Sequence, residues 1–229
     1  MSTVRALVIA DGNAPDRRAL DEAWPGWSAV DLVVAADGGA RLAARLGLRI
    51  NLWVGDGDSL GDAEIEDLRR AGVSIARAAT DKDESDTELG LLAAVQAGAS
   101  DITILGALGG ERLDHALANV LLLAHPGAEG ATVRLLHDQT RVRLLRGPDP
   151  AGAPVAMDVT GPVGDLVSLL PLAAVHGATT AGLAFPLRDA DLSAGPALGL
   201  SNLRVATRAS IKIHSGRLLV VESPATLAT

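Results

Sequence analysis

The chain has no cysteine and no tyrosine, and aromatic residues make up only 2% of its 229 residues. The lack of cysteine excludes disulfides, thiolate nucleophiles and zinc sites built from cysteine. It also means that the sequence does not indicate whether the protein resides in an oxidising or a reducing compartment. Apart from histidine, the ring side chains are Trp24, Trp27, Trp53 and Phe185. These are almost the only rings that could stack on a planar ligand.

Positive charge is also scarce, with 20 lysines and arginines against 28 aspartates and glutamates and a net charge of −8. Binding to a nucleic-acid backbone needs a basic surface that releases counterions, so we expect no nucleic-acid partner. A phosphate ligand would have to be bound locally, by a metal and by backbone N–H groups.

Long apolar runs are missing too. No run reaches the length of a membrane span, and residues 6–10 are too short for the core of a signal peptide. The 48% of apolar residues is nevertheless enough for a substantial core. We therefore expect a soluble, cytoplasmic, globular protein with no membrane partner.

The first half alternates short apolar, β-branched runs with segments of helical apolar spacing. The strand-like runs are residues 6–10, 32–36, 52–54, 73–75, 102–105 and 133–136, and the helical segments are 40–48, 63–71, 89–97 and 113–124. This alternation predicts a doubly wound α/β domain around a mainly parallel sheet.

The pattern changes near Asp138, where a segment rich in proline and glycine (147–152) and then several short strand-like runs follow. Such runs, without a long helical period, indicate a smaller β-rich sandwich or barrel. We predict an α/β domain over residues 1–138 and a β-rich domain over 139–229.

Two carboxylates, Asp56 and Asp58, follow the apolar run 50–54 in a segment loosened by glycine. In an extended segment they would point the same way and crowd negative charge. Carboxylate oxygens suit Mg²⁺, which takes one or two of them and leaves its other positions to water and phosphate. A tight turn is the alternative, since Gly, Asp and Ser all favour turns.

Polar residues also follow the other predicted strands, and ligands collect outside the carboxyl ends of parallel strands. The segment 11–13 (Asp-Gly-Asn) follows the first run, and Asp37, Gly38 and Gly39 follow the second. The two glycines would let backbone N–H groups approach a phosphate or nucleoside, although a glycine-rich turn there is also common. No Walker A motif occurs.

A second acidic cluster spans residues 81–88. Ser85 and Glu88 have capping-box spacing, so Ser85 should start a helix with Asp86 in its first turn. The helix dipole explains an acid in that turn but does not explain Asp83, which lies before the cap. If this cluster lies near the first pair of carboxylates, it indicates metal or phosphate binding.

A third group lies between residues 109 and 119. On a helix, Arg112, His115 and Asn119 form one polar stripe, and an arginine at the helix start suits a polyphosphate. The alternative is a stripe that merely faces solvent. The apolar positions of this helix, which we expect to serve the core, are Leu113, Leu117, Val120 and Leu121.

Six short motifs, in this order and spacing, resemble those of the thiamine pyrophosphokinase family. They are DGGA at 37–40, GDGDS at 55–59, KDESD at 82–86, GGERLDHALAN at 109–119, GLAFPL at 182–187 and SN at 201–202. The resemblance spans residues 35–221. It implies a catalytic α/β domain that binds nucleotide and metal, a β-rich domain that binds thiamine, and a homodimer with sites where domains of two subunits meet.

The resemblance also implies a role for each matching residue. The Mg²⁺ ligands would be Asp56, Asp58, Asp83 and Asp86, and the catalytic residues Asp56, Asp58, Asp83 and Arg112. The nucleotide would contact Asp37, Gly38, Gly39, Lys82, Asp114, His115 and Asn119. Thiamine would contact Phe185, Ser201 and Asn202.

The implied reaction transfers the pyrophosphoryl group of ATP to the hydroxyethyl oxygen of thiamine and gives thiamine diphosphate and AMP. Asp58 is our candidate for the proton acceptor. The chain departs from the family pattern at Gly57, where an aromatic residue is usual, and at Ser85, where threonine is usual. Ala184 and Phe185 stand where a basic residue and a larger ring often occur.

Three other functions fit parts of the sequence. A pyrophosphokinase for another alcohol, such as a hydroxymethyl pterin, would keep the reaction and change the acceptor. A non-catalytic sensor of nucleotide or thiamine diphosphate would not need all the carboxylates. A sugar-nucleotide transferase would use the Asp56 and Asp58 pair but would leave residues 112–119 unexplained.

Overall fold

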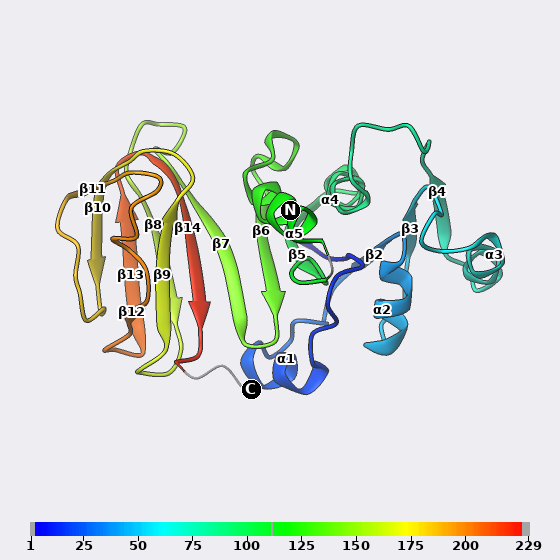
Figure 1. The fold of residues 1–229 in the computed structure, drawn as a ribbon, viewed down its shortest axis with the longest axis horizontal. Coiled ribbons are helices and arrows are strands. Elements are labelled where there is room, and N and C mark those ends of the chain that lie inside the picture. Colours follow the sequence, from blue (N-terminus) through cyan, green and yellow to red (C-terminus); the bar gives the residue numbers. More distant parts are fainter. Residues whose placement is uncertain (1–2, 111, 226–229) are drawn as a thin grey trace. The chain divides into compact units, whose positions relative to one another are not determined.

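The computed structural model describes residues 3–110 and 112–225. The chain divides into two compact units, Met1–Gln139 and Thr140–Thr229. Figure 1 shows helices and strands together in the first unit and only strands in the second. Each unit is described by itself below.

The first unit is built on parallel strands. Their order across the sheet is β6 (Thr132–His137), β5 (Ala99–Leu105), β1 (Val4–Ile9), β2 (Leu32–Ala36), β3 (Leu52–Gly55) and β4 (Ser74–Arg77). Every neighbouring pair runs parallel, and Leu7 of β1 lies opposite Val33 of β2 and Thr103 of β5. The predicted mainly parallel α/β fold is confirmed.

The helices of this unit are α1 (Arg17–Ala23), α2 (Gly39–Arg45), α3 (Asp62–Arg70), α4 (Asp86–Gln96) and α5 (Leu113–Leu121), with the 3₁₀ turns η1 (Leu122–Ala124) and η2 (Pro126–Ala128). Helix α1 was not predicted from the sequence. It is one short stretch with a single buried residue, Leu20, so it has almost no apolar period. Its start is fixed by Asp16, whose carboxylate accepts a hydrogen bond from the N–H of Ala19.

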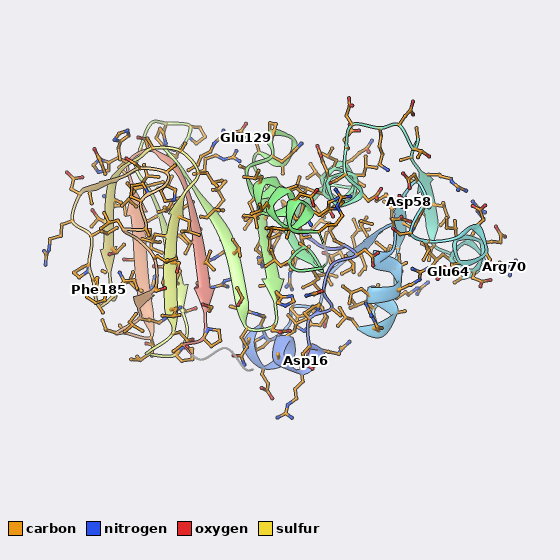
Figure 2. The ribbon with its side chains drawn as sticks, viewed as in Figure 1. Asp16, Asp58, Glu64, Arg70, Glu129 and Phe185 are labelled. Atoms are coloured by element: carbon orange, nitrogen blue, oxygen red, sulfur yellow. The ribbon has the colours of Figure 1, made fainter. Side chains whose placement is uncertain are left out.

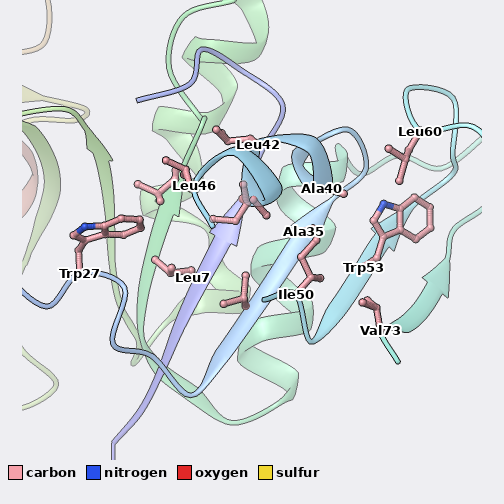
Figure 3. Close-up of a cluster of buried hydrophobic side chains, with 14 of the residues drawn as sticks. Leu7, Trp27, Ala35, Ala40, Leu42, Leu46, Ile50, Trp53, Leu60 and Val73 are labelled. Carbon is pink, nitrogen blue, oxygen red and sulfur yellow. The ribbon is translucent and has the colours of Figure 1, made fainter. Parts of the chain in front are cut away.

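Side chains alternate between the two faces of the sheet. Leu7 and Ile9 of β1 belong to a buried cluster that includes Leu42 of α2 and Trp53 of β3 (Figure 3). Val8 points to the other face, where α4 crosses at Gly90. A Cβ at this glycine would lie 2.8 Å from Cγ1 of Val8, so its absence lets α4 pack close to the strands and cover this face.

Helix α5 is oriented differently from our prediction. Of the four apolar residues that we expected to serve the core, the three leucines are in fact exposed: Leu113 at 72%, Leu117 at 58% and Leu121 at 56%. The residue of α5 that is buried is the polar Asn119. The prediction was wrong because the side of the helix that carries Asn119, and not the side that carries the three leucines, packs against the rest of the unit.

The second unit contains two antiparallel sheets. One has the order β12 (Asn202–Leu203), β9 (Leu166–Pro171), β14 (Gly216–Ser223) and β7 (Thr140–Gly147). The other has the order β11 (Ala190–Leu192), β10 (Val175–Ala181), β13 (Arg208–Ile213) and β8 (Val155–Thr160). Both sheets contribute to one hydrophobic core, which confirms the predicted β-rich architecture.

Strand β7 was not predicted, because arginines replace apolar residues in its pattern. Arg141 and Arg143 lie on the face that also carries Leu145, a core residue. Both arginines donate hydrogen bonds to Glu222 of β14, so at this end of the sheet a network of charged side chains takes the place of apolar core residues. In the part of the chain that the structure describes, no helix has the length and apolar character needed to cross a membrane.

Candidate active site

A cavity of about 480 Å³ lies in the first unit, at the carboxyl ends of its parallel strands. Segments that follow β1, β2, β3, β4 and β5 contribute to its walls, together with the first turns of α4 and α5. Its charged and imidazole side chains are Asp11, Asp37, Asp58, Lys82, Glu84, Asp86, Arg112 and His115. The cavity therefore lies where ligands of α/β sheets collect.

Four carboxylates gather at this end of the sheet. One oxygen each of Asp37, Asp56, Asp58 and Asp86 lies within 4.8 Å of the others. Asp37 follows β2, Asp56 and Asp58 follow β3, and Asp86 begins α4. Figure 2 shows Asp58 beyond the end of β3. Separate strand ends thus bring together the oxygen ligands that Mg²⁺ prefers.

Asp37 is the member of this cluster that our metal prediction left out. Its residue is only 2% exposed, and its carboxylate accepts hydrogen bonds from the N–H groups of Ser59 (2.9 Å) and Leu60 (3.3 Å). Burial raises the pKa of Asp37 to about 6, the hydrogen bond from Ser59 opposes the rise, and the neighbouring Asp58 adds to it. Asp37 therefore both holds the β3 loop and faces the other acids.

The loop that carries Asp56 and Asp58 is a tight turn as well as part of the cluster. The N–H of Asp58 donates to Oδ1 of Asp56 at 3.0 Å, and Gly57 between them has a φ of +85°, which favours glycine. A Cβ at Gly57 would lie 2.9 Å from Cδ1 of Ile65. The sequence left open whether this segment is a tight turn or a metal site. The loop is a tight turn whose two aspartates also belong to the carboxylate cluster.

Lys82 lies between two of the acids. Its Nζ is 3.0 Å from Oδ2 of Asp56 and 2.9 Å from Oδ1 of Asp86, and its side chain is 12% exposed. Burial would lower the pKa of Lys82, but the hydrogen bonds and charges of the two aspartates outweigh burial and raise it. The hydrogen bond from Lys82 in turn lowers the pKa of Asp56. One ammonium thus faces several carboxylates, and the cluster keeps an excess of negative charge.

Asp86 supplies a further sign that the cluster suits a cation. Its Oδ1 is buried, and its partner among the described residues is the ammonium of Lys82 at 2.9 Å. Lys82 also pairs with Asp56, so one positive charge is shared by two carboxylates. A divalent cation would supply the charge that this sharing leaves uncompensated.

Asp83, in contrast, lies outside the four-carboxylate cluster and does not line the cavity. It is exposed and precedes the helix cap. As predicted, Ser85 caps α4, and its Oγ accepts from the N–H of Glu88 at 3.2 Å. The side chain of Glu88 lies 3.1 Å from Nε2 of His125, so it does not complete a capping box.

The first turn of α5 faces another part of the cavity. Arg112, His115 and Asn119 all line it, as their spacing on one helix face predicts. Nδ2 of Asn119 donates to the carbonyl of Ala107 at 2.9 Å and anchors the helix to the loop after β5. Nε of Arg112 donates to Asp114 at 3.2 Å, and Asp114 itself is not part of the lining. Glu111, in the same motif, lies outside the described residues.

The sequence analysis did not assign a role to Asp11, which also lines the cavity. A Cβ at Gly38 would lie 2.2 Å from Oδ2 of Asp11, so this glycine makes room for the carboxylate. Burial raises the pKa of Asp11, and the charges of Arg41 and Arg45 oppose the rise. Its place directly after the first apolar run was the sequence signal for this residue.

The predicted thiamine contacts lie in the second unit. Phe185 is 70% exposed and Asn202 is 6% exposed. Ser201 has a φ of +55°, which is unusual for a residue with a side chain, and its N–H donates to Oγ of Ser168 at 3.0 Å. Phe185 and Ser201 are accessible to a ligand, whereas Asn202 is enclosed.

Comparisons with known proteins agree with this arrangement. Residues 24–135 match the model for "Thiamin pyrophosphokinase, catalytic domain", and residues 157–218 match that for "Thiamin pyrophosphokinase, vitamin B1 binding domain". A thiamine pyrophosphokinase from Bacillus subtilis (strain 168) is 26% identical over 170 residues, which cover 74% of this chain and 76% of that protein.

Solved structures have the same fold. A thiamin pyrophosphokinase family protein from Enterococcus faecalis has a TM-score of 0.80 and 27% identity, with 97% of this chain and 100% of that chain covered. Yeast thiamin pyrophosphokinase, at 17% identity, has a TM-score of 0.74 over 97% of this chain and 87% of that chain, and its likeness shows the fold alone. The two matching family models together span more than half of the sequence, and the chain belongs to the thiamin pyrophosphokinase family of diphosphotransferases.

Proposed function

We propose that this protein transfers the pyrophosphoryl group of ATP to the hydroxyethyl oxygen of thiamine and releases thiamine diphosphate and AMP. The observation that carries the proposal is the cluster of four carboxylates, three of which line a cavity that also contains Lys82 and Arg112. Phosphoryl transfer depends mainly on positioning and on charge stabilisation, which these groups are suited to supply. We propose that the reaction takes place in the cytoplasm.

The metal of this reaction would be Mg²⁺, held by the carboxylates of the cluster: Asp37, Asp56, Asp58 and Asp86. When bound, it would neutralise phosphate charge and hold the phosphates for in-line attack. Asp83, which the resemblance also assigns to the metal, is in our proposal an outer residue of the same acidic segment.

Other residues of the cavity would bind and orient the nucleotide. Arg112 offers fixed paired donors to phosphate oxygens, and Lys82 adds a second positive charge. His115, Asn119 and the segment 37–39 would hold the remainder of the nucleotide. Asp58 is exposed to the cavity and accepts a hydrogen bond from Oγ of Ser59 at 3.1 Å, and it is our candidate acceptor for the hydroxyl proton of thiamine.

Thiamine would lie against the second unit, on the ring of Phe185 and near Ser201. Its thiazolium carries a permanent positive charge, which is attracted to the face of an aromatic ring. We propose that Asn202 belongs to this region in a different role, which is argued in the next subsection.

We further propose a homodimer. Leu113, Leu117 and Leu121 are spaced four residues apart on α5 and are 56–72% exposed, which makes an apolar stripe on the helix surface. Such a stripe is typical of an interaction surface. The same face of α5 in a second copy of the chain is the partner that a symmetric dimer would provide.

Replacing Leu117 by arginine should convert the dimer to a monomer, because a charge would be buried in an apolar contact. Light scattering coupled to size-exclusion chromatography measures the mass. Ala63→Arg, on the exposed surface of α3, is the matched control and should leave the mass unchanged. A wild-type protein that is monomeric, or a Leu117→Arg variant that is still dimeric, would rule out this interface.

The affinity for Mg²⁺ should depend on pH through Asp37. Because its pKa is raised to about 6 in the metal-free protein, a proton must leave before a cation binds below that pH. The affinity should therefore rise as the pH increases through about 6 and level off above it. Calorimetric titration of Mg²⁺ between pH 5 and 8 measures this, and an affinity independent of pH would remove Asp37 from the metal site.

The function itself is tested by incubating the protein with Mg-ATP and thiamine and identifying the products. AMP and thiamine diphosphate are expected. ADP with thiamine monophosphate would overturn the proposal. So would turnover with a hydroxymethyl pterin but not with thiamine, or binding of both substrates without turnover.

A further inference from the structure

Asn202 uses its side chain amide to hold the backbone of Phe185. Its Oδ1 accepts from the N–H of Phe185 at 3.0 Å, and its Nδ2 donates to the carbonyl of the same residue at 2.7 Å. Asn202 is 6% exposed, and both bonds are partly buried. An asparagine amide has one oxygen and one NH₂ group, and here each is engaged by the same backbone unit.

The residue that is held in this way carries an unusual ring. Phe185 is the single phenylalanine of the chain, and there is no tyrosine. Trp27 and Trp53 are 5% and 0% exposed, and Trp24 is partly buried. Within the described residues and apart from histidine, Phe185 is therefore the aromatic ring that is most open to a ligand, at 70% exposure.

The segment around Asn202 gives this hold a rigid base. Ala184 donates its N–H to the carbonyl of Leu203 at 2.8 Å, and Val205 donates to that of Gly182 at 2.9 Å, so segments 182–185 and 202–205 are joined by an antiparallel bridge between Leu183 and Arg204. Side chains alternate along the second segment: Asn202 and Arg204 point inward, at 6% and 2% exposure, while Leu203 and Val205 are exposed.

Arg204 connects this bridge to the rest of the second unit. Its Nη2 lies 3.6 Å from Oε1 of Glu222 on β14, and its N–H donates to the carbonyl of Asp165 at 2.9 Å. Asn202 itself pairs with Val167 of β9. Pairing with β9 thus fixes the backbone of Asn202. Through its two side-chain hydrogen bonds, Asn202 in turn restrains the backbone of Phe185.

We propose that Asn202 is a positioning residue, which orients the ring of Phe185 as a platform for the planar, cationic substrate and does not contact that substrate itself. This inference rests on the proposed function for the identity of the substrate. An exposed ring on a loose loop would lose conformational freedom when it binds a ligand. The paired hydrogen bonds fix the loop in advance and so favour binding.

The single phenylalanine makes the proposal directly measurable. Labelling with ¹⁵N-phenylalanine gives one amide signal, whose hydrogen exchange reports the bond between Phe185 and Asn202. Labelling with 4-fluorophenylalanine gives one ¹⁹F signal, whose shift reports thiamine at the ring. Both measurements use the full-length protein, and steady-state kinetics with Mg-ATP and thiamine complete the set.

Asn202→Ala should speed the amide exchange of Phe185 by about tenfold, which corresponds to the loss of a hydrogen bond worth about 1.4 kcal/mol. It should raise the KM for thiamine by a similar factor and leave kcat and the KM for ATP nearly unchanged. Asn202→Asp keeps an acceptor for the N–H but loses the donor to the carbonyl, so it should protect the amide and still raise the KM for thiamine.

Asn51→Ala is the matched control. Oδ1 of Asn51 accepts from the N–H of Val33 at 2.8 Å in the first unit, so the substitution removes the same kind of bond at a place without a ligand role. It should change neither the exchange of Phe185 nor the KM for thiamine. Thermal unfolding of each variant shows that the fold is retained.

Two results would overturn the proposal. A raised KM for thiamine in Asn202→Ala with unchanged amide exchange would mean that Asn202 contacts the substrate directly. Faster exchange with an unchanged KM would mean that the order of this loop does not matter for binding. If wild-type protein shows no turnover and no ¹⁹F shift with thiamine, the proposed function fails, and the exchange rates still test whether Asn202 holds Phe185.

Discussion

Asp56→Asn should lower the turnover number by about a hundredfold or more while the protein remains folded, an effect typical of removing one preorganised charge from an active site. Asp56 lies in the carboxylate cluster, and its Oδ2 is 3.0 Å from Nζ of Lys82. An amide retains the shape and removes the charge that would hold the metal. Initial rates at saturating ATP and thiamine, over a range of Mg²⁺ concentrations, measure the loss.

Asp67→Asn is the control for this prediction. Asp67 is an exposed residue of α3 that pairs with Arg70 at 2.9 Å, and its loss should leave the rate unchanged. Asp83→Asn distinguishes the ligand set that the family resemblance implies, which includes Asp83, from the four-carboxylate cluster, which does not. A loss as large as that of Asp56→Asn would assign Asp83 to the metal, whereas a small loss would assign the metal to the four clustered acids. Near-normal turnover of Asp56→Asn would remove Asp56 from the site.

Glu222→Gln should lower the free energy of unfolding of the second unit by about 3–5 kcal/mol, the usual range when one partner of a buried ion pair is removed. Glu222 is 3% exposed and is bound by Nε and Nη2 of Arg141 at 2.6 and 2.9 Å and by Arg143 at 3.0 Å. Arg204, 2% exposed, lies 3.6 Å away. Without the carboxylate, three clustered guanidinium groups would lose their shared counter-charge.

Urea unfolding tests this prediction with two signals. The three tryptophans all lie in the first unit, so their fluorescence reports that unit, while far-ultraviolet circular dichroism reports both units. Glu222→Gln should shift the dichroism transition to lower urea more than the fluorescence transition. Asp158→Asn removes the exposed pair with Arg208 in the same unit and should change little. Equal midpoints for Glu222→Gln and wild type would show that the arginines do not need this carboxylate.

The strands and helices with clear apolar periods could be predicted from the sequence, and others could not. The strands β1, β2 and β5 each end in a continuous run of buried residues, and the N-cap residue Ser85 marks the start of α4. Strand β7 was missed because Arg141 and Arg143 occupy inward positions, and charge at such positions conceals the alternation. For α5, the period was correct but the inward face was assigned to the leucines, since a cavity lined by polar groups leaves no sign in local spacing.

Three members of the carboxylate cluster, Asp56, Asp58 and Asp86, could be predicted because short motifs place them directly after a strand or at a helix start. The place of Asp37 depends on the distance between two neighbouring strand ends, which one sequence does not contain. The same holds for Asn202, whose polar side chain resembles a ligand contact in the sequence but is occupied by Phe185 in the fold. Tertiary pairing, rather than residue type, decides between these roles.

The position of Lys82 has a consequence for how the cluster responds to a cation. Its ammonium already lies against Asp56 and Asp86, two of the four acids that would hold a divalent ion. Entry of the ion and retention of both contacts therefore compete for the same negative charge. The side chain acts as a tethered counterion that offsets part of the negative charge of the acids, and a divalent cation bound by the cluster would take over that role.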